Sequence, residues 1–360
     1  MEDSKSLPPF TENGEYHNLT ELTHLFNYTL TYCDLGLDEN TKRVILFVLY
    51  LIIFVVGLVE NLLVIWVNWQ TRSHKNLVNL YIFNMAIADL GVVLSLPVWM
   101  LEVMLNYTWL WGGSLCRFTH YFYFANMYSS IFFLTCLSVD RYVTLTTSSP
   151  FWHRHQHIVR RLVCCCVWAF AAIIPLPEVA HMEFLETVEP LCFFMPPLEA
   201  YDEWALALTL LMAFIGFLIP FSIMAIFNIL TARHLKRTNK PENRKHCLLI
   251  YAYIAVFLFS WLPFHLVLLL VTLEGTSIFL HCYFVDFLYF FYDIVDCLSL
   301  LHCMVNPILY NFLSKNFRGK LISAVVRYIP KDQMDQKGRD GSSSATQHSI
   351  VITKDNISPN

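Results

Sequence analysis

Seven apolar stretches, each long enough to cross a bilayer, constrain this chain more than any other feature of its sequence. They are residues 44–67, 77–104, 114–144, 158–177, 203–233, 244–273 and 283–311. A helix rises about 1.5 Å per residue and the hydrocarbon core of a bilayer is about 30 Å thick, so about 20 apolar residues span it. The sequence therefore predicts an all-α membrane protein, a bundle of seven transmembrane helices.

The composition excludes several other classes of protein. Only 14% of the 360 residues are charged, whereas soluble domains carry about 25%. This low charge excludes a soluble enzyme, a disordered protein and a nucleic-acid-binding protein. The chain also lacks the HExxH, GxSxG and P-loop motifs of common enzymes, and no lysine lies between Lys245 and Lys315 to hold retinal. We therefore expect neither an enzyme nor a light sensor.

Lysine and arginine set the orientation of the bundle. Four of the 24 lie in segments assigned to the outside, and the other 20 lie in the inner loops and the C-terminal segment. Because cytoplasmic loops of membrane proteins carry this excess of positive charge, we place the N-terminus outside the plasma membrane and the C-terminus in the cytosol. No internal repeat is visible, which argues against a transporter built from duplicated halves.

The chain divides into an acidic extracellular segment, the helix bundle, an amphipathic helix on the inner membrane surface and a disordered cytosolic tail: residues 1–43, 44–311, 312–328 and 329–360. Asn18 and Asn27 are glycosylation sites of the first segment. The tail carries hydroxyl groups whose phosphorylation would supply negative charge for arrestin: Ser342, Ser343, Ser344, Thr346 and Ser349. The alternative for these residues is a serine-rich linker.

Three motifs within the spans point to a protein that switches between two states. They are Asp140-Arg141-Tyr142 in the third span, Trp261-Leu262-Pro263 in the sixth and Asn306-Pro307-Ile308-Leu309-Tyr310 in the seventh. Arg141 can pair with Asp140 in one state and release it in the other. The alternative for Arg141 taken alone is an ordinary basic residue beside the membrane.

Asp89 lies in the middle of the second span, where an ionised group is costly and is therefore a candidate functional residue. Asn126, Ser130 and Asn306 are polar residues of other spans that can reach it. Together these side chains are candidates to bind a sodium ion through oxygen atoms. The alternative is a hydrogen-bonded cluster between helices without an ion. We expect no other cofactor.

With these motifs the chain resembles the rhodopsin-like (class A) G-protein-coupled receptors along all of its length except the two tails. This resemblance implies an outer ligand pocket and an inner surface for an effector. Two further motifs resemble the chemokine receptors: Ser95-Leu96-Pro97 and Trp109-Leu110-Trp111-Gly112. Four segments resemble the atypical chemokine receptors in particular: residues 118–124, 126–130, 140–146 and 346–350.

The resemblance also implies two disulfides on the outer side. Cys116 and Cys192 stand where the wider family carries a bridge, and Cys33 and Cys282 where chemokine receptors carry an extra one. Such bonds form in the oxidising outer compartment. The alternative for each of these cysteines is a small buried hydrophobic residue.

The loop after the fourth span and its flank form an acidic rim without lysine or arginine: Glu178, Glu183, Glu186, Glu189, Glu199, Asp202 and Glu203. Negative charge of this kind attracts cations and speeds their arrival. Chemokines are basic, so the rim and the resemblance together imply basic chemokine ligands. The alternative is a set of solvated loops whose charge has no such role.

Asp296 stands where chemokine receptors commonly carry a glutamate that meets the N-terminus of the ligand, and Asp293 lies three residues earlier on the same helix. The candidate ligand-binding residues are Trp99, Tyr123, Glu178, Tyr289, Asp293 and Asp296. The alternative for the carboxylates is that they are solvent-exposed polar groups at the outer ends of the helices. The alternative for the aromatic residues is that they only pack between helices.

Two departures from the chemokine-receptor pattern bear on signalling. Thr144 belongs to a run, Val143 to Thr146, that replaces the usual Leu-Ala-Ile-Val, and Asn228 replaces a tyrosine that normally supports the released arginine. Both changes fall on the surface that would receive a G protein. We therefore expect a receptor that binds basic chemokines, internalises them to endosomes with arrestin and activates G proteins weakly or not at all. The alternative is a conventional G-protein-coupled peptide receptor.

Overall fold

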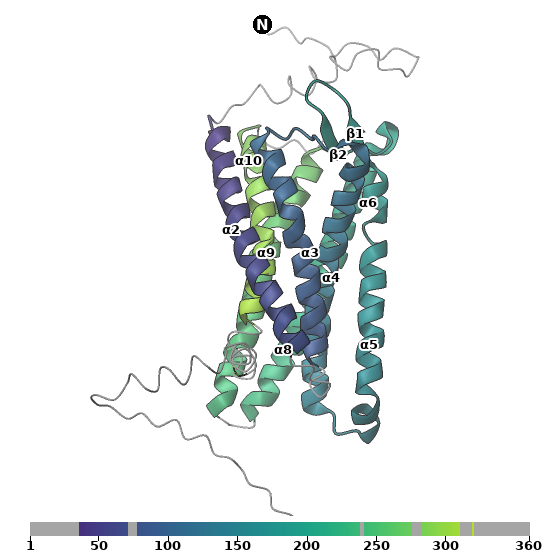
Figure 1. Cartoon of the computed structure of the whole chain (residues 1–360), viewed down its shortest axis with the longest axis vertical. Coiled ribbons are helices and arrows are strands. Elements are labelled where there is room, and N and C mark those ends of the chain that lie inside the picture. The colour runs from purple at the N-terminus through teal and green to yellow at the C-terminus, as the bar shows by residue number, and fades with distance from the viewer. Residues whose placement is uncertain (1–35, 71–77, 238–240, 276–281, 310–318, 320–360) are drawn as a thin grey trace, which may run out of the picture.

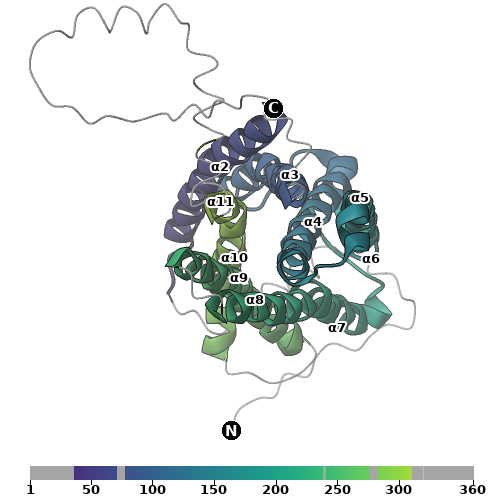
Figure 2. The same ribbon diagram turned by 90° about the horizontal axis from the view of Figure 1, so that it is seen from below.

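Long helices that run side by side make up almost all of the part of the chain that the computed structural model describes, residues 36–70, 78–237, 241–275, 282–309 and 319 (Figure 1). In chain order they are α2 (Glu39–Gln70), α3 (Val78–Met104), α4 (Gly112–Thr146), α5 (Pro150–Ile173), α7 (Tyr201–Leu211), α8 (Ile219–Arg237), α9 (Pro241–Gly275), α10 (Cys282–Ser299) and α11 (Leu301–Pro307). Seen along their length they form a ring (Figure 2).

Six stretches of helix among the described residues are long and apolar enough to cross a membrane. α10 and α11 follow one another around Leu300 and form the seventh column of the ring (Figure 2). The fifth column combines α7 and α8 with the π-helical segment η2 (Met212–Leu218) between them. Pro220 lies just after η2 and has no backbone N–H to donate, which favours irregular helix geometry at this point. The arrangement is the predicted bundle of seven transmembrane helices.

Two helix starts show how local sequence sets the boundaries. α5 begins at Pro150, eight residues before the predicted start of the fourth span, because proline is well tolerated at the first helical position. α7 begins with Asp202 and Glu203 in its first turn, where negative charge interacts favourably with the helix dipole. The early start of α5 places Arg160 well inside the helix and not in a loop.

α4 runs through the middle of the bundle and organises its core. In its most apolar window 67% of the residues are buried, against 22% in the stretch of α5 and its neighbour α6 (Leu176–Ala180). It contacts α3, α5 and α8. Because polar groups inside a membrane protein face the bundle interior, a central helix is the natural place for the polar residues of a functional site.

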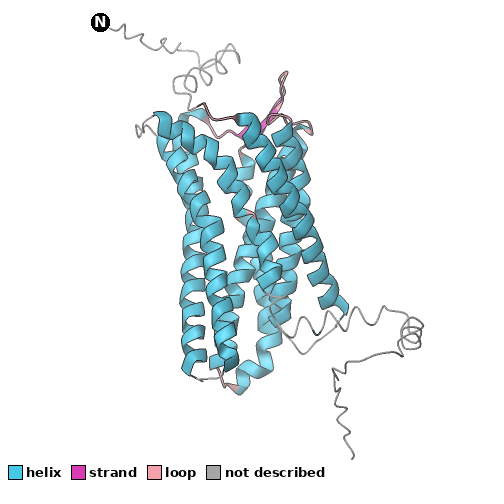
Figure 3. Cartoon of the chain, turned by 90° about the vertical axis from the view of Figure 1, so that its left-hand side faces the viewer, coloured by secondary structure: helices cyan, strands magenta, loops and turns pink. Residues whose placement is uncertain are grey.

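A β-hairpin covers the outer end of the bundle and was absent from the sequence-based prediction (Figure 3). Its antiparallel strands are β1 (Met182–Leu185) and β2 (Leu191–Phe194), with Phe184 opposite Cys192. A short 3-10 helix, η1 (Leu198–Ala200), leads from the hairpin to α7. The hairpin carries part of the acidic rim, so the fold places this charge directly above the ring of helices.

Several predictions concern residues outside the described part of the chain. These are the extracellular segment with Asn18, Asn27 and Cys33, the amphipathic helix 312–328, the tail with Ser342, Ser343, Ser344, Thr346 and Ser349, and Tyr310. The backbone of Cys282 begins α10, but its side chain is likewise outside the description. The Cys33–Cys282 disulfide, the glycosylation sites and the phosphorylation sites therefore stay predictions.

Candidate ligand pocket and inner switch

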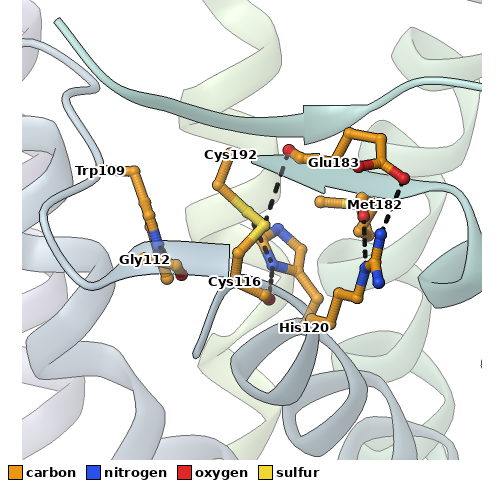
Figure 4. Close-up of a disulfide and its surroundings, with 8 residues drawn as sticks. Trp109, Gly112, Cys116, His120, Met182, Glu183 and Cys192 are labelled. Carbon is orange, nitrogen blue, oxygen red and sulfur yellow. Dashed lines mark hydrogen bonds and ion pairs between the residues drawn. A yellow bond between two sulfur atoms is a disulfide. The ribbon is translucent and has the colours of Figure 1, made fainter. Parts of the chain in front are cut away.

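The predicted disulfide between Cys116 and Cys192 is present and ties the hairpin to the start of α4 (Figure 4). Arg117, one residue after Cys116, makes a second attachment. Its Nε donates to the Met182 carbonyl oxygen at 2.9 Å, and its Nη2 lies 2.7 Å from Glu183 Oε1. The disulfide and these two contacts fix the hairpin, residues 182–194, over the outer end of α4. The hairpin is called the roof of the candidate ligand site below.

An aromatic wall lies below this roof. Trp109 is fully buried, and its Nε1 donates to the Gly112 carbonyl oxygen at 3.0 Å (Figure 4). The ring of Trp99 is 6.3 Å from that of Trp109 and 5.9 Å from that of Tyr123, measured between centroids. The structure thus brings together Trp99 and Tyr123, two of the residues predicted to line the pocket, on α3 and α4. The first contact is tilted and the second is edge-to-face, and aromatic contacts of both kinds stabilise a rigid wall.

Asp293 already has partners within the protein. Its Oδ2 accepts a hydrogen bond from Tyr107 Oη at 2.6 Å and lies 3.1 Å from Lys42 Nζ. Lys42 also pairs with Glu39 at 2.7 Å, packs over the ring of Phe290 and is only 5% exposed. Burial and the adjacent carboxylate raise the pKa of Tyr107, so its hydroxyl stays protonated as a donor. The carboxylate of Asp293 is therefore engaged by Tyr107 and by Lys42, which it shares with Glu39.

Asp296 differs from Asp293 in this respect. It lies one helical turn deeper on α10, and among the described residues its carboxylate has neither a hydrogen-bond donor nor a cationic partner. It interacts electrostatically with Tyr50 of α2, Tyr123 of α4 and Tyr292 of α10. A half-buried carboxylate among three tyrosines is suited to bind a cationic group that enters from outside.

The two remaining candidates lie apart from this wall. Tyr289 is 42% exposed, and its hydroxyl donates to Glu274 of α9 at 3.4 Å, so it belongs to the rim between α9 and α10. Glu178 lies on α6, beyond the outer end of α5, and interacts electrostatically with Tyr292. The structure therefore groups Trp99, Tyr123 and Asp296 and leaves Tyr289 apart from them, so the pocket that they would line stays a prediction.

Asp89 is fully buried in the middle of the bundle and joins three helices. Its carboxylate accepts hydrogen bonds from Ser130 of α4 and, at 3.2 Å, from Asn306 Nδ2 of α11. Asn126 donates to the Phe122 carbonyl oxygen of its own helix and packs against Gly91. The structure thus brings three of the four predicted sodium ligands into contact.

Trp261 lies between this polar cluster and the outer pocket. It is 1% exposed, and its ring centroid is 5.0 Å from that of His302 on α11. The Nε2 atom of His302 lies 3.9 Å from Asp89 Oδ1. His302 therefore contacts Trp261 on one side and lies close to Asp89 on the other. A movement of the Trp261 side chain can thus be transmitted through His302 to Asp89.

We propose that the Asp89 cluster binds a sodium ion. The donor set fits a hard cation, because Asp89 offers carboxylate oxygens, Ser130 offers a hydroxyl oxygen and no lysine or arginine among the described residues pairs with the carboxylate. Replacing sodium by choline at constant ionic strength is expected to change the affinity for a panel of fluorescent basic chemokines by about fivefold or more. Asp89→Ala should abolish this dependence, and an equal dependence in both proteins would contradict the proposal.

The inner end of α4 holds a different ion pair from the one predicted. Both carboxylate oxygens of Asp140 accept hydrogen bonds from Arg160 of α5, from Nε at 2.7 Å and from Nη2 at 2.8 Å. The guanidinium of Arg141 instead lies over the ring of Tyr253 on α9, 5.2 Å from its centroid. The expected pairing of Asp140 with Arg141 is therefore not the one in this structure, because Arg160 supplies a fork that matches the carboxylate.

The two departures in the sequence lie beside this pair. Thr144 Oγ1 accepts a hydrogen bond from Arg160 at 3.0 Å. Asn228 of α8 is 2% exposed and donates to Ser138 Oγ at 3.2 Å, so a short amide occupies the place expected for a tyrosine. Tyr142, the last residue of its motif, packs against Phe227 at 5.6 Å between ring centroids.

Comparison with known proteins places the chain in a family. Residues 60–310 match the 7 transmembrane receptor (rhodopsin family). The chain belongs to this family. It is 62% identical to G-protein coupled receptor 182 of Homo sapiens over 353 residues, which cover 98% of this chain and 87% of that protein. It is 35% identical to atypical chemokine receptor 3 of Homo sapiens over 326 residues, which cover 86% of this chain and 88% of that protein.

Membership of the rhodopsin family confirms three predictions. The chain is a multi-pass membrane protein, it is a receptor, and it is not an enzyme. The family implies a ligand on one side and a G protein on the other. The relationship to atypical chemokine receptors that the sequence motifs indicated is also confirmed at the level of similarity.

Three residues of this receptor were not singled out as functional by the sequence. Lys42 and Arg160 counted only as outer and inner basic residues, and Tyr107 only as part of an outer loop. One signal for Arg160 is present, since it shares helical spacing with the other buried residues of α5, namely Cys164, Val167 and Ala171. A signal for Lys42 is its place three residues after Glu39.

Proposed function

We propose that this receptor captures basic chemokines at its outer mouth, with its N-terminus outside the plasma membrane, and internalises them with weak or no activation of G proteins. The observation that carries the proposal is the contrast between the two carboxylates of α10. Asp293 pairs with Lys42, whereas the half-buried Asp296 has no cationic partner among the described residues. A cationic N-terminus of a ligand supplies the missing charge.

The acidic rim supports the same class of ligand. Four exposed carboxylates without a cationic partner among the described residues lie in the hairpin region and at the start of α7, namely Glu186, Glu189, Asp202 and Glu203. Field lines from charges of one sign speed the arrival of an oppositely charged protein. The 35% identity to a protein named atypical chemokine receptor 3 favours chemokines over other basic proteins.

Steering by the rim has a measurable consequence. The association rate constant of a basic chemokine is expected to fall by about tenfold or more between 20 mM and 200 mM salt, because salt screens exposed charges beyond about 10 Å. The dissociation rate constant should change much less. Surface plasmon resonance on receptor held in nanodiscs measures both rate constants. An association rate constant that does not change with salt concentration would contradict electrostatic steering by the rim.

The function as a whole is tested on cells. We expect cells that express the receptor to take up at least one member of a panel of fluorescent basic chemokines, with little G-protein activation in a parallel assay. Arrestin is proposed to bind the tail once Ser342, Ser343, Ser344, Thr346 and Ser349 carry phosphates. Uptake of a neutral or acidic peptide alone, with every basic chemokine ignored, would contradict the proposal.

The second candidate function is that of a conventional G-protein-coupled peptide receptor. It is favoured by the complete Asp140-Arg141-Tyr142 motif at the inner end of α4. A strong ligand-driven change in cyclic AMP in the parallel assay would establish this function in place of the first.

A double variant separates the two candidates at the level of residues. Asn228→Tyr with Thr144→Ala is expected to raise ligand-driven G-protein activation, because the tyrosine can support Arg141 and the alanine removes a hydroxyl that Arg160 holds. We expect a rise of about fivefold or more in nucleotide exchange. Ile226→Ala, at an exposed position two residues before Asn228, serves as the control. An unchanged rate at equal surface expression would show that these two departures do not cause weak coupling.

A further inference from the structure

The Asp140–Arg160 pair is the most deeply buried pair of an arginine or lysine with a carboxylate among the described residues. The side chains are 4% and 2% exposed, and two parallel hydrogen bonds of 2.7 and 2.8 Å join them. Arg161, the next residue, is exposed. Helical spacing therefore turns one of two adjacent arginines into the bundle and the other out of it.

Burying a guanidinium is unfavourable unless every strong contact is made. Arg160 makes three hydrogen bonds, all to residues of α4, because its Nη2 also donates to Thr144 at 3.0 Å. Tyr81 of α3 is 3% exposed and interacts electrostatically with both members of the pair. Three helices thus meet at Asp140, and each of its two carboxylate oxygens accepts a hydrogen bond from Arg160.

This arrangement decides where Arg141 goes. Each carboxylate oxygen can accept more than one hydrogen bond, but the fork of Arg160 already compensates the charge of Asp140 through two short bonds and so weakens its attraction for Arg141. Arg141 lies over Tyr253 and so connects α4 to α9. The contact resembles the released half of the two-state switch expected from the motif.

We propose that Arg160 is a built-in counter-ion of Asp140 that holds Arg141 on α9 in the absence of ligand. Arg160 is a positioning residue, because it acts on the inner surface only through Asp140 and Thr144. The inference deepens the proposed function and rests on it. If Arg141 is already released from Asp140, a ligand can shift the equilibrium of the inner surface only slightly, and ligand-driven activation of G proteins stays weak.

The test measures the inner surface directly, in purified receptor without ligand. Spin labels on noncanonical amino acids at Leu145 of α4 and Leu248 of α9, both exposed near the inner ends of their helices, report the distance between the two helices. In Arg160→Gln, Asp140 becomes available to Arg141, and the distance is expected to shorten by about 2 Å or more. The matched control Arg161→Gln should leave it unchanged.

Two more variants keep the result decisive if Arg160→Gln does not fold. Arg160→Lys retains the charge but not the fork, and is expected to give a smaller shortening in the same direction. Asp140→Asn with Arg160→Gln removes both charges, leaves no unpaired buried ion and gives Arg141 no carboxylate to return to, so the long distance should persist. A shortening in this double variant equal to that in Arg160→Gln would overturn the inference, as would no shortening in Arg160→Gln and Arg160→Lys.

The measurement is independent of any ligand, so the two proposals can fail separately. If the distance responds as expected while cells take up no basic chemokine, the proposed function is wrong and the role of Arg160 stands. If cells take up a basic chemokine while the distance between the two spin labels is unchanged in the Arg160 variants, the proposed function stands and Arg160 only stabilises the bundle.

Discussion

Replacing both Cys116 and Cys192 by serine is expected to abolish capture of basic chemokines almost completely. The bridge joins residues separated by 76 positions, and a disulfide that closes a loop of this length stabilises the fold by about 2–4 kcal/mol. Without it, the hairpin is held at the outer end of the bundle by the contacts of Arg117 and by the hydrogen bond from the backbone N–H of Trp109 to the Pro190 carbonyl oxygen at 2.7 Å. If that stabilisation is lost from the binding-competent state, affinity falls by about 30-fold to 1000-fold.

The double variant is preferable to a single one, because a single substitution leaves an unpaired thiol free to form other disulfides. Equilibrium binding of fluorescent basic chemokines to cells, corrected for surface expression, measures the loss. Cys165→Ser, at an exposed cysteine of α5 that forms no disulfide, is the matched control and should bind as the unaltered receptor does. Affinity within about threefold of the original in the double variant would show that the contacts of Arg117 and Trp109 suffice to hold the roof.

The sequence was sufficient for the bundle because hydropathy and length suffice to recognise a membrane span. The seven predicted stretches all correspond to helices, and their ends differ by a few residues, most at α5, where Pro150 starts the helix early. The hairpin was not predicted, since its strands have only four residues each and no turn motif marks them. The Cys116–Cys192 disulfide came from family resemblance and not from cysteine spacing.

The partners of charged residues were harder to predict than their locations. Asp140 and Asp293 were both identified, but the sequence paired the first with its neighbour Arg141 and left the second open to ligand. The actual partners, Arg160 and Lys42, are distant in sequence, and which face of a helix meets another depends on helix rotation and tilt. Propensity and periodicity do not encode that rotation, so a pair between helices requires the structure.

The second large effect is expected at Asp296. Asp296→Asn keeps the size of the side chain and removes its charge, so a cationic ligand terminus loses a charge-assisted interaction worth about 1.5–3 kcal/mol. We expect affinity for basic chemokines to fall by about 10-fold to 150-fold. The matched variant is Asp293→Asn, one helical turn away, where Lys42 and Tyr107 already occupy the carboxylate. Its effect on affinity should stay within about threefold.

Kinetics distinguish a direct contact from a general effect of charge. Both variants remove one negative charge from the same region of α10, so long-range attraction weakens equally and the association rate constants should fall to the same small extent. Only Asp296→Asn removes a contact made in the complex, so only this variant should raise the dissociation rate constant. If the two variants weaken binding equally, and through association alone, Asp296 contributes only to the field of the mouth. A larger effect of Asp293→Asn would mean that the ligand displaces Lys42 and binds Asp293 directly.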